Sequence, residues 1–174
     1  MNVLVFGATN STTSINQQLA KYAGSLIKGA NVEALDLNDF EMPIYSPQRE
    51  EALGQPKLAQ QFYKKIGDAD AIIISFAEHN GSYTAAYKNL FDWTSRIDMK
   101  VFQNKPMVML ATSPGPGGAN SVLSSAVNSA PFFAAQVKAS LSVPSFFDNF
   151  DMEKRVLINP ELDKALNEAV GQLV

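Results

Sequence analysis

The sequence predicts a single α/β domain in which helices cover both faces of a five-stranded parallel sheet. Short apolar runs alternate with segments of helical periodicity five times along the 174 residues, a pattern typical of strand–helix–strand units. The run Ala71–Phe76 (AIIISF) is apolar at nearly every position, as expected of a strand that is buried on both sides. No repeat or linker divides the chain, so we expect one domain spanning residues 1–174.

The first strand is predicted at Val3–Phe6, where an apolar run ends at Gly7. Apolar side chains then recur at helical spacing from Ile15 to Ile27, which indicates an amphipathic helix. Ser14 is a suitable N-cap, and Gly29 can end the helix.

A second strand is predicted at Asn31–Leu37, followed by a polar connection, Asn38–Gln55, that contains two prolines. The next helix is expected from about Pro56, because apolar residues recur every four positions at Leu58, Phe62 and Ile66.

The rest of the chain continues the alternation. Strands are predicted at Pro106–Thr112 and Lys138–Val143. Helices are predicted at Ala85–Arg96, at Asn120–Ala135 and from Pro160, which suits the first turn of a last helix.

Five such strands favour the spatial order 2-1-3-4-5, that of the flavodoxin-like three-layer sandwich. In that order strands 1, 3 and 4 are neighbours. The connections reverse direction between strands 1 and 3, which opens a crevice at the carboxyl ends of the strands.

The composition excludes several kinds of function. A formal net charge of −3 without a run of Lys and Arg argues against nucleic acid or an anionic membrane as the main partner. The absence of cysteine excludes disulfides, thiolate metal sites and cysteine nucleophiles. No apolar stretch reaches the ~20 residues of a membrane span, and the first residues (MNVLVFG) lack a basic leader. We therefore expect a cytoplasmic protein.

Three loops of glycine, hydroxyl and amide residues each follow a predicted strand. They are Gly7–Asn16 (GATNSTTSIN), Ala77–Tyr83 (AEHNGSY) and Ser113–Asn120 (SPGPGGAN). Because they follow strands 1, 3 and 4, we expect all three to line the crevice, where a phosphorylated planar ligand can bind.

The first loop opens a helix, and free N–H groups at a helix start favour phosphate. Residues 2–20 include no Lys or Arg, so a phosphate would be held by dipoles and hydroxyl groups. The loop is neither GxGxxG nor a Walker sequence. The alternative is an ordinary Ser/Thr-rich turn with a good cap.

The second and third loops could contact a ring. Gly81 allows close approach of the backbone, while Asn80 and His79 offer polar and aromatic contacts. His79 could also act as a general base, but we favour contact without proton transfer because no Ser–His–Asp arrangement is evident. The Pro/Gly-rich third loop suits a rigid floor beneath a ligand, or simply a tight connection.

Together the loops resemble those of the NAD(P)H-dependent FMN reductase family, which includes FMN, quinone, azo-dye and chromate reductases. The second loop is the most specific match: Glu78–Ser82 and Lys88–Trp93 (EHNGS and KNLFDW) resemble PEYNGSxPGxLKNAxDW at the same spacing. Thr112–Gly118 resembles TSxGxxGG, and the first loop resembles GSxRxxSxN with about one extra residue. The likeness runs over about residues 3–170.

The resemblance implies FMN as cofactor, NADPH or NADH as co-substrate and a homodimer or homotetramer. The segments Asn38–Gln55 and Ile97–Asn104 are candidates for the subunit contact. Its cofactor-binding residues map here onto Thr9, Ser11, Thr13, Ser14 and Asn16 around the phosphate, and onto Glu78, His79, Asn80, Gly81, Ser113, Gly115 and Gly118 around the ring.

The sequence departs from the family pattern at several positions. Asn10 stands where arginine is usual, Ala77 replaces a proline and His79 a tyrosine. Thr84–Ala85 replaces a Pro-Gly pair, so we expect a less constrained turn there.

The resemblance implies hydride transfer from a nicotinamide to bound FMN and on to a small acceptor such as a quinone or free flavin. No protein side chain is expected to be catalytic and no metal is expected, because the flavin carries the chemistry. The alternatives are a flavodoxin-like electron carrier without NAD(P)H turnover, and a binding protein that has lost flavin.

Overall fold

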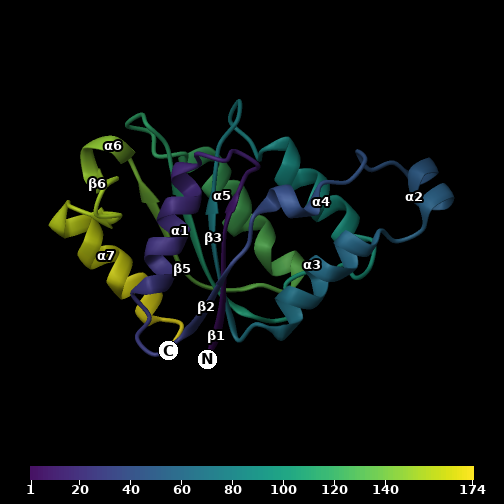
Figure 1. The fold of residues 1–174 in the computed structure, drawn as a ribbon, viewed down its shortest axis with the longest axis horizontal. Coiled ribbons are helices and arrows are strands. Elements are labelled where there is room, and N and C mark those ends of the chain that lie inside the picture. Colours follow the sequence, from purple (N-terminus) through teal and green to yellow (C-terminus); the bar gives the residue numbers. More distant parts are fainter.

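A computed structural model describes residues 1–174 and shows the predicted three-layer α/β sandwich (Figure 1). The strands form one parallel sheet in the order β2-β1-β3-β4-β5, which confirms the predicted topology. Their bounds are Asn2–Ala8 (β1), Asn31–Ala34 (β2), Ala71–Phe76 (β3), Pro106–Thr112 (β4) and Gln136–Val143 (β5).

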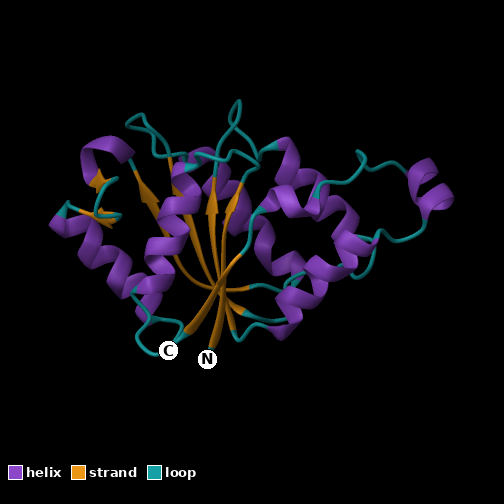
Figure 2. Ribbon diagram, in the orientation of Figure 1, coloured by secondary structure: helices purple, strands orange, loops and turns teal.

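Strand register aligns the ends of the three central strands. Phe76, the last residue of β3, pairs with Ala8 of β1 and with Ala111 of β4. The chain therefore leaves β1, β3 and β4 at one level, and the loops after these strands emerge at the same edge of the sheet (Figure 2).

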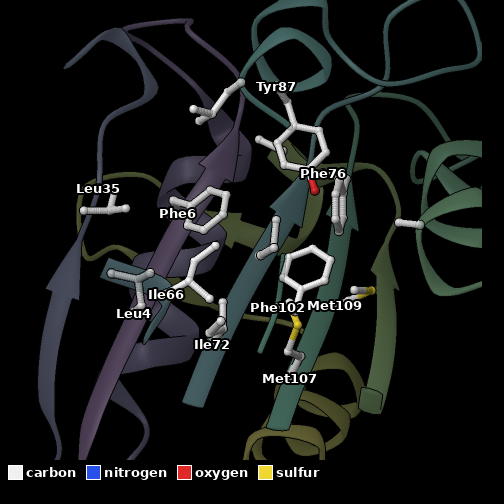
Figure 3. Close-up of a cluster of buried hydrophobic side chains, with 14 of the residues drawn as sticks. Leu4, Phe6, Leu35, Ile66, Ile72, Phe76, Tyr87, Phe102, Met107 and Met109 are labelled. Atoms are coloured by element: carbon white, nitrogen blue, oxygen red, sulfur yellow. The ribbon is translucent and has the colours of Figure 1, made fainter. Parts of the chain in front are cut away.

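Helices cover both faces of the sheet. α1 (Ile15–Ser25) and α7 (Pro160–Gly171) pack on one face, and α3 (Lys57–Asp68), α4 (Ala85–Ser95) and α5 (Asn120–Ser129) on the other. Side chains alternate between the two cores, as the period of a strand requires. On β1, Leu4 and Phe6 join the α3–α5 side (Figure 3), whereas Val3 and Val5 join the α1–α7 side.

Two predicted elements are shorter in the structure. β2 ends at Ala34 instead of Leu37, because the Asp36 carboxylate accepts a hydrogen bond from the Asn38 N–H and starts the 3₁₀ turn η1 (Leu37–Phe40). The helix predicted to Ala135 ends at Ser129 and continues as the 3₁₀ turn η2 (Ala130–Phe133). Pro131 lacks the N–H that another α-helical turn needs.

The first helix also ends earlier than Gly29, at Ser25. Its predicted cap is confirmed, since the Ser14 hydroxyl accepts from the Gln17 N–H at 3.1 Å. The last helix begins at Pro160 as predicted, with Asn159 as its cap.

Three features were not predicted. The connection after β2 contains a short helix, α2 (Pro47–Leu53), which has no buried residue and extends away from the rest of the molecule (Figure 1). After β5 the chain forms α6 (Phe146–Asn149) and a small antiparallel hairpin of β6 (Phe150–Asp151) and β7 (Val156–Leu157).

None of the helices has the length and hydropathy needed to span a bilayer.

Candidate functional site

A polar hollow of about 270 Å³ opens at the carboxyl edge of the sheet, where the loops after β1, β3 and β4 meet. We call it the edge hollow. Eight of the twelve predicted cofactor-binding residues line it: Thr9, Ser11, Thr13, Ser14, Asn16, Glu78, His79 and Ser113.

Four predicted residues, Asn80, Gly81, Gly115 and Gly118, do not line the edge hollow. Sequence reasoning in turn missed Ile15, Ala77, Thr112, Pro114 and Phe147. Phe147 is a 59% exposed aromatic ring, and it follows β5, so the argument that placed the other loops at this edge would have found it.

The start of α1 supplies hydrogen-bond donors to the edge hollow. The first turn of a helix has N–H groups with no partner inside the helix, and those of Ile15 and Asn16 have no other backbone partner. The hydroxyl groups of Thr9, Ser11, Thr13 and Ser14 surround them. No Lys or Arg lines this surface, so an anion here would be held by N–H groups, hydroxyls and the helix dipole.

Gly7 allows α1 to begin close to β1. A Cβ at this position would lie 2.7 Å from Gln17 N and 3.0 Å from Gln17 Cα, closer than real contacts permit. The Gln17 side chain holds the arrangement, since its Oε1 accepts from the Gly7 N–H (2.5 Å) and its Nε2 donates to the Leu35 carbonyl (2.8 Å). The loop geometry therefore depends on the absence of a side chain at residue 7.

The Asn16 side chain ties three elements together beneath the edge hollow. Its Oδ1 accepts from the Ser75 hydroxyl (2.7 Å) and from the Thr112 N–H (3.1 Å), and its Nδ2 donates to the Thr112 carbonyl (3.1 Å). Asn16 is 3% exposed. With its oxygen accepting two hydrogen bonds, this amide fixes the ends of β3 and β4 against α1.

The loop after β3 contains a tight turn. Asn80 and Gly81 both have positive φ, 53° and 75°, and His79 and Ser82 exchange backbone hydrogen bonds of 3.0 and 3.1 Å. Asn-Gly is the favoured pair for such a turn. Gly81 is therefore explained by backbone conformation alone, because a Cβ there would meet nothing within 4 Å.

The segment after this turn is well anchored, so the expectation of a less constrained turn at Thr84–Ala85 was wrong. The Thr84 hydroxyl donates to the Ala8 carbonyl (2.8 Å) and accepts from the Tyr87 N–H (3.2 Å). Thr84 thereby caps α4 and joins it to the end of β1, with 1% of its surface exposed. The tie replaces the rigidity that a proline would have provided.

Glu78 connects the second loop to the start of α5. Its carboxylate accepts from the Val122 N–H at 2.8 Å, in the first turn of α5. A carboxylate at a helix start is stabilised by the free N–H groups and the dipole there. One of its oxygens is thus engaged within the protein.

The loop after β4 packs against the end of β5. Gly118 has φ 56°, and a Cβ there would lie 2.2 Å from Ser142 Oγ and 3.1 Å from Pro144 N. The Ser142 hydroxyl donates to the Gly118 carbonyl at 2.7 Å. The Phe146 N–H donates to the Ser113 carbonyl at 3.1 Å, so this loop and the start of α6 hold each other in place.

The donor set fits a phosphorylated cofactor better than a metal. The hollow offers hydroxyl and N–H donors around a helix start, with one carboxylate that is already hydrogen-bonded. Strand order and the place of the hollow together define a flavodoxin-like domain with a cleft at its topological switch point.

Comparison with known proteins identifies the family. The model of the family described as "NADPH-dependent FMN reductase" matches residues 1–148, and the chain belongs to this family. The name of this family specifies FMN and NADPH. The matched region contains all three loops.

Two relatives agree with this assignment. The chain is 30% identical over 114 residues to an NAD(P)H-dependent FMN reductase of Pseudomonas aeruginosa, covering 66% of this chain and 60% of that protein. It is 32% identical over 113 residues to an NADPH:quinone oxidoreductase of Arabidopsis thaliana, covering 63% of this chain and 56% of the relative. The matches thus span roughly three fifths of those two relatives.

A solved structure supports the fold. FerB, a flavoenzyme NAD(P)H:(acceptor) oxidoreductase from Paracoccus denitrificans, superposes with a TM-score of 0.77 at 22% identity, covering 99% of this chain and 94% of that one. An FMN-dependent NADH-azoreductase from Bacillus anthracis, solved with FMN, superposes with a TM-score of 0.67 at 13% identity, covering 99% of each chain. The flavodoxin-like fold predicted from the sequence is confirmed.

Proposed function

We propose that this chain binds FMN at the edge hollow and catalyses its reduction by NAD(P)H, with a small acceptor such as a quinone or free flavin as oxidant. The observation that carries the proposal is the edge hollow itself, an anion cradle formed by the three loops that match the family motif. Relatives named as FMN and quinone reductases support the same activity.

The phosphate would be held at the start of α1. The proposed donors are the N–H groups of Ile15 and Asn16 and the hydroxyls of Thr9, Ser11, Thr13 and Ser14. For Asn16 we propose a positioning role for the side chain, because its amide oxygen accepts two hydrogen bonds and its Nδ2 is bonded to the Thr112 carbonyl.

The ring would lie against the loops after β3 and β4. We propose two sets of neighbours for the ring. On one side they are Glu78, His79, Asn80 and Gly81, and on the other side they are Ser113, Gly115 and Gly118. FMN, when bound, supplies the hydride-accepting chemistry. The protein's part is to orient donor and acceptor at contact distance, which lowers the entropic cost of the reaction.

Absorbance spectroscopy and turnover test this proposal. Purified protein is expected to carry or take up FMN, and anaerobic titration with NADH and with NADPH is expected to bleach the flavin absorbance. Steady-state oxidation of either nucleotide with a quinone separates a reductase from an electron carrier, which would bind FMN without turnover. Protein that takes up no FMN would refute the proposal.

A charge substitution tests the phosphate cradle. Thr13 lines the edge hollow and Thr12, an exposed neighbour, does not. We expect Thr13→Glu to weaken FMN binding by at least about tenfold through like-charge repulsion, with a smaller effect on riboflavin, which has no phosphate. Thr12→Glu is the matched control. Equal losses in both variants, or equal losses for both flavins, would contradict the cradle.

We also propose a homodimer or homotetramer in the cytoplasm, with the extended connection Asn38–Gln55 and the segment Ile97–Asn104 at the contact. Ile44 is 63% exposed, Leu53 57% and Met99 56%, so both segments present apolar side chains to solvent. Light scattering coupled to size exclusion tests this proposal, and Leu53→Glu is expected to shift the protein toward smaller species.

A further inference from the structure

A second cavity, of about 380 Å³, lies on the other side of the loop Ala77–Tyr83, between α4 and α5. We call it the aromatic pocket. It shares no lining residue with the edge hollow. Six of its thirteen lining residues are aromatic: Phe76, Tyr83, Tyr87, Phe91, Phe102 and Phe133. Phe102 and a seventh lining residue, Met99, belong to the segment Ile97–Asn104 proposed above for the subunit contact.

The pocket lies between two helices that pack on different neighbours. α4 packs on α3 and η1, while α5 packs on β4, β5 and η2. The rings stack around the space between the helices in edge and tilted contacts, with Phe91 and Phe133 at 4.7 Å and Phe76 and Tyr87 at 5.4 Å between centroids. Such contacts hold aromatic walls in fixed positions.

One polar group in this wall lacks a partner. Tyr87 is 4% exposed, and its hydroxyl makes no hydrogen bond within the chain, although its backbone N–H donates to Thr84 Oγ1. Figure 3 shows the hydroxyl oxygen directed inward, toward Phe76. Burial raises the pKa of Tyr87 well above its usual value, so the hydroxyl keeps its proton and can donate it.

The hydroxyl still has access to the cavity. The one fully enclosed side-chain atom without a partner is Gln55 Oε1, and Gln55 does not line this pocket. The Tyr87 oxygen is therefore not sealed in, and a group inside the pocket can reach it. A neighbouring pair, the hydroxyls of Tyr83 and Ser129, is separated by 3.5 Å, the outer limit of a hydrogen bond.

The mouth of the pocket offers no net charge. Lys88 Nζ and Asp92 Oδ1 lie 2.7 Å apart, one helical turn from each other, and neutralise one another at the rim. The site therefore favours an uncharged ligand, because burying an unpaired ion among aromatic rings would cost several kcal/mol.

We propose that the aromatic pocket binds a small neutral aromatic carbonyl compound, with its rings among the phenylalanines and its carbonyl oxygen accepting from the Tyr87 hydroxyl. The volume lies in the range of small-molecule sites, which are mostly apolar with a few placed polar groups. The proposal is independent of FMN binding, since the two cavities do not overlap in their walls.

The test uses 1-tetralone, a redox-inert bicyclic ketone, and tetralin, the same skeleton without the carbonyl. Both are titrated by calorimetry into the whole protein with saturating FMN. We expect one site per chain and about fivefold tighter binding of the ketone, the usual net effect of one hydrogen bond. Tyr87→Phe should reduce that ratio to about one. Tyr63→Phe is the matched control, because the Tyr63 hydroxyl donates to Asp98 outside the pocket.

A second variant keeps the test independent of Tyr87. Ala126 lines the pocket from α5 and is 4% exposed, so Ala126→Leu should fill the space and abolish binding of both compounds. The flavin spectrum should be unchanged throughout.

Absence of saturable binding would overturn the proposal, whether the pocket is closed by a second copy of the chain or is simply empty. So would a ketone preference that survives Tyr87→Phe, or competition between 1-tetralone and FMN. A colourless protein that still binds 1-tetralone would refute only the proposed reductase.

Discussion

The edge hollow and the aromatic pocket lie on either side of one loop, yet they are built on different principles. In and next to the edge hollow, side chains such as Asn16, Glu78 and Thr84 are hydrogen-bonded across elements. In the aromatic pocket, rings define the wall and the Tyr87 hydroxyl is unpaired. The first site is held by polar bonds between distant segments, whereas the second is a space between two helices with mostly apolar lining residues.

The contrast teaches where a polar substitution should matter. A buried polar group that is paired costs free energy when its partner is lost, whereas one that is already unpaired can be removed without penalty. Removing a paired polar group at the hollow should therefore destabilise the fold and weaken flavin binding together, whereas removing the unpaired Tyr87 hydroxyl should leave stability almost unchanged.

The largest effect is expected at Asn16. Asn16→Asp replaces the Nδ2 donor with a carboxylate oxygen that faces the Thr112 carbonyl. We expect a loss of about 3 kcal/mol in the free energy of unfolding, measured by denaturant titration, because a buried charge replaces a paired amide. FMN affinity should fall as well. Asn128→Asp, at an exposed position of α5, is the control and should change stability little.

Gly7 gives the next largest effect. Gly7→Ala would place a Cβ 2.7 Å from the Gln17 backbone nitrogen, so α1 must move away from β1. We expect about 2 kcal/mol of destabilisation, as for other overpacked sites, together with weaker FMN binding. Gly117→Ala is the control, since a Cβ there meets nothing within 4 Å. Equal effects of the two substitutions would contradict the role assigned to close approach.

Glu78 sharpens the comparison at the boundary between the two sites. Glu78→Ala removes the acceptor for the Val122 N–H and should cost about 1 kcal/mol, the usual value of a cap at a helix start. Glu78→Gln retains an acceptor oxygen and should recover most of this loss. Thermal unfolding of the two variants measures the difference, and identical melting temperatures would show that the tie contributes nothing.

The smallest effects compare a paired with an unpaired tyrosine hydroxyl. The Tyr22 hydroxyl donates to Asp163 Oδ1 at 2.5 Å, between α1 and α7. Tyr22→Phe should cost ~0.5–1 kcal/mol at neutral pH, whereas Tyr87→Phe should be neutral or slightly stabilising. A clear loss of stability in Tyr87→Phe would show that its hydroxyl is paired after all.

Alkaline pH tests the hydrogen bond of Tyr22 separately. Burial and the Asp163 carboxylate raise the pKa of Tyr22 to about 12 from its ordinary 10.0. A raised pKa in the folded state means that the stabilisation is complete below pH ~10 and is lost as pH rises through ~12. Unfolding curves between these limits should show a smaller pH dependence in Tyr22→Phe than in the parent protein.

Local patterns in the sequence determined the architecture and the place of the site. The alternation of apolar runs with helical periodicity predicted all five strands of the main sheet. The polar loops after β1, β3 and β4 predicted that the site lies at the carboxyl edge of this sheet. Ser14 as a cap was also evident, because capping depends on residues three positions apart.

Tertiary structure alone decided what those residues contact. From the sequence, Asn16 was predicted to contact the phosphate, but its side-chain amide is bonded to Thr112, 96 positions away. The aromatic pocket had no local signal for the same reason. Hydrogen bonds and packing between distant segments depend on strand order, register and helix tilt, and periodicity along the chain specifies none of the three.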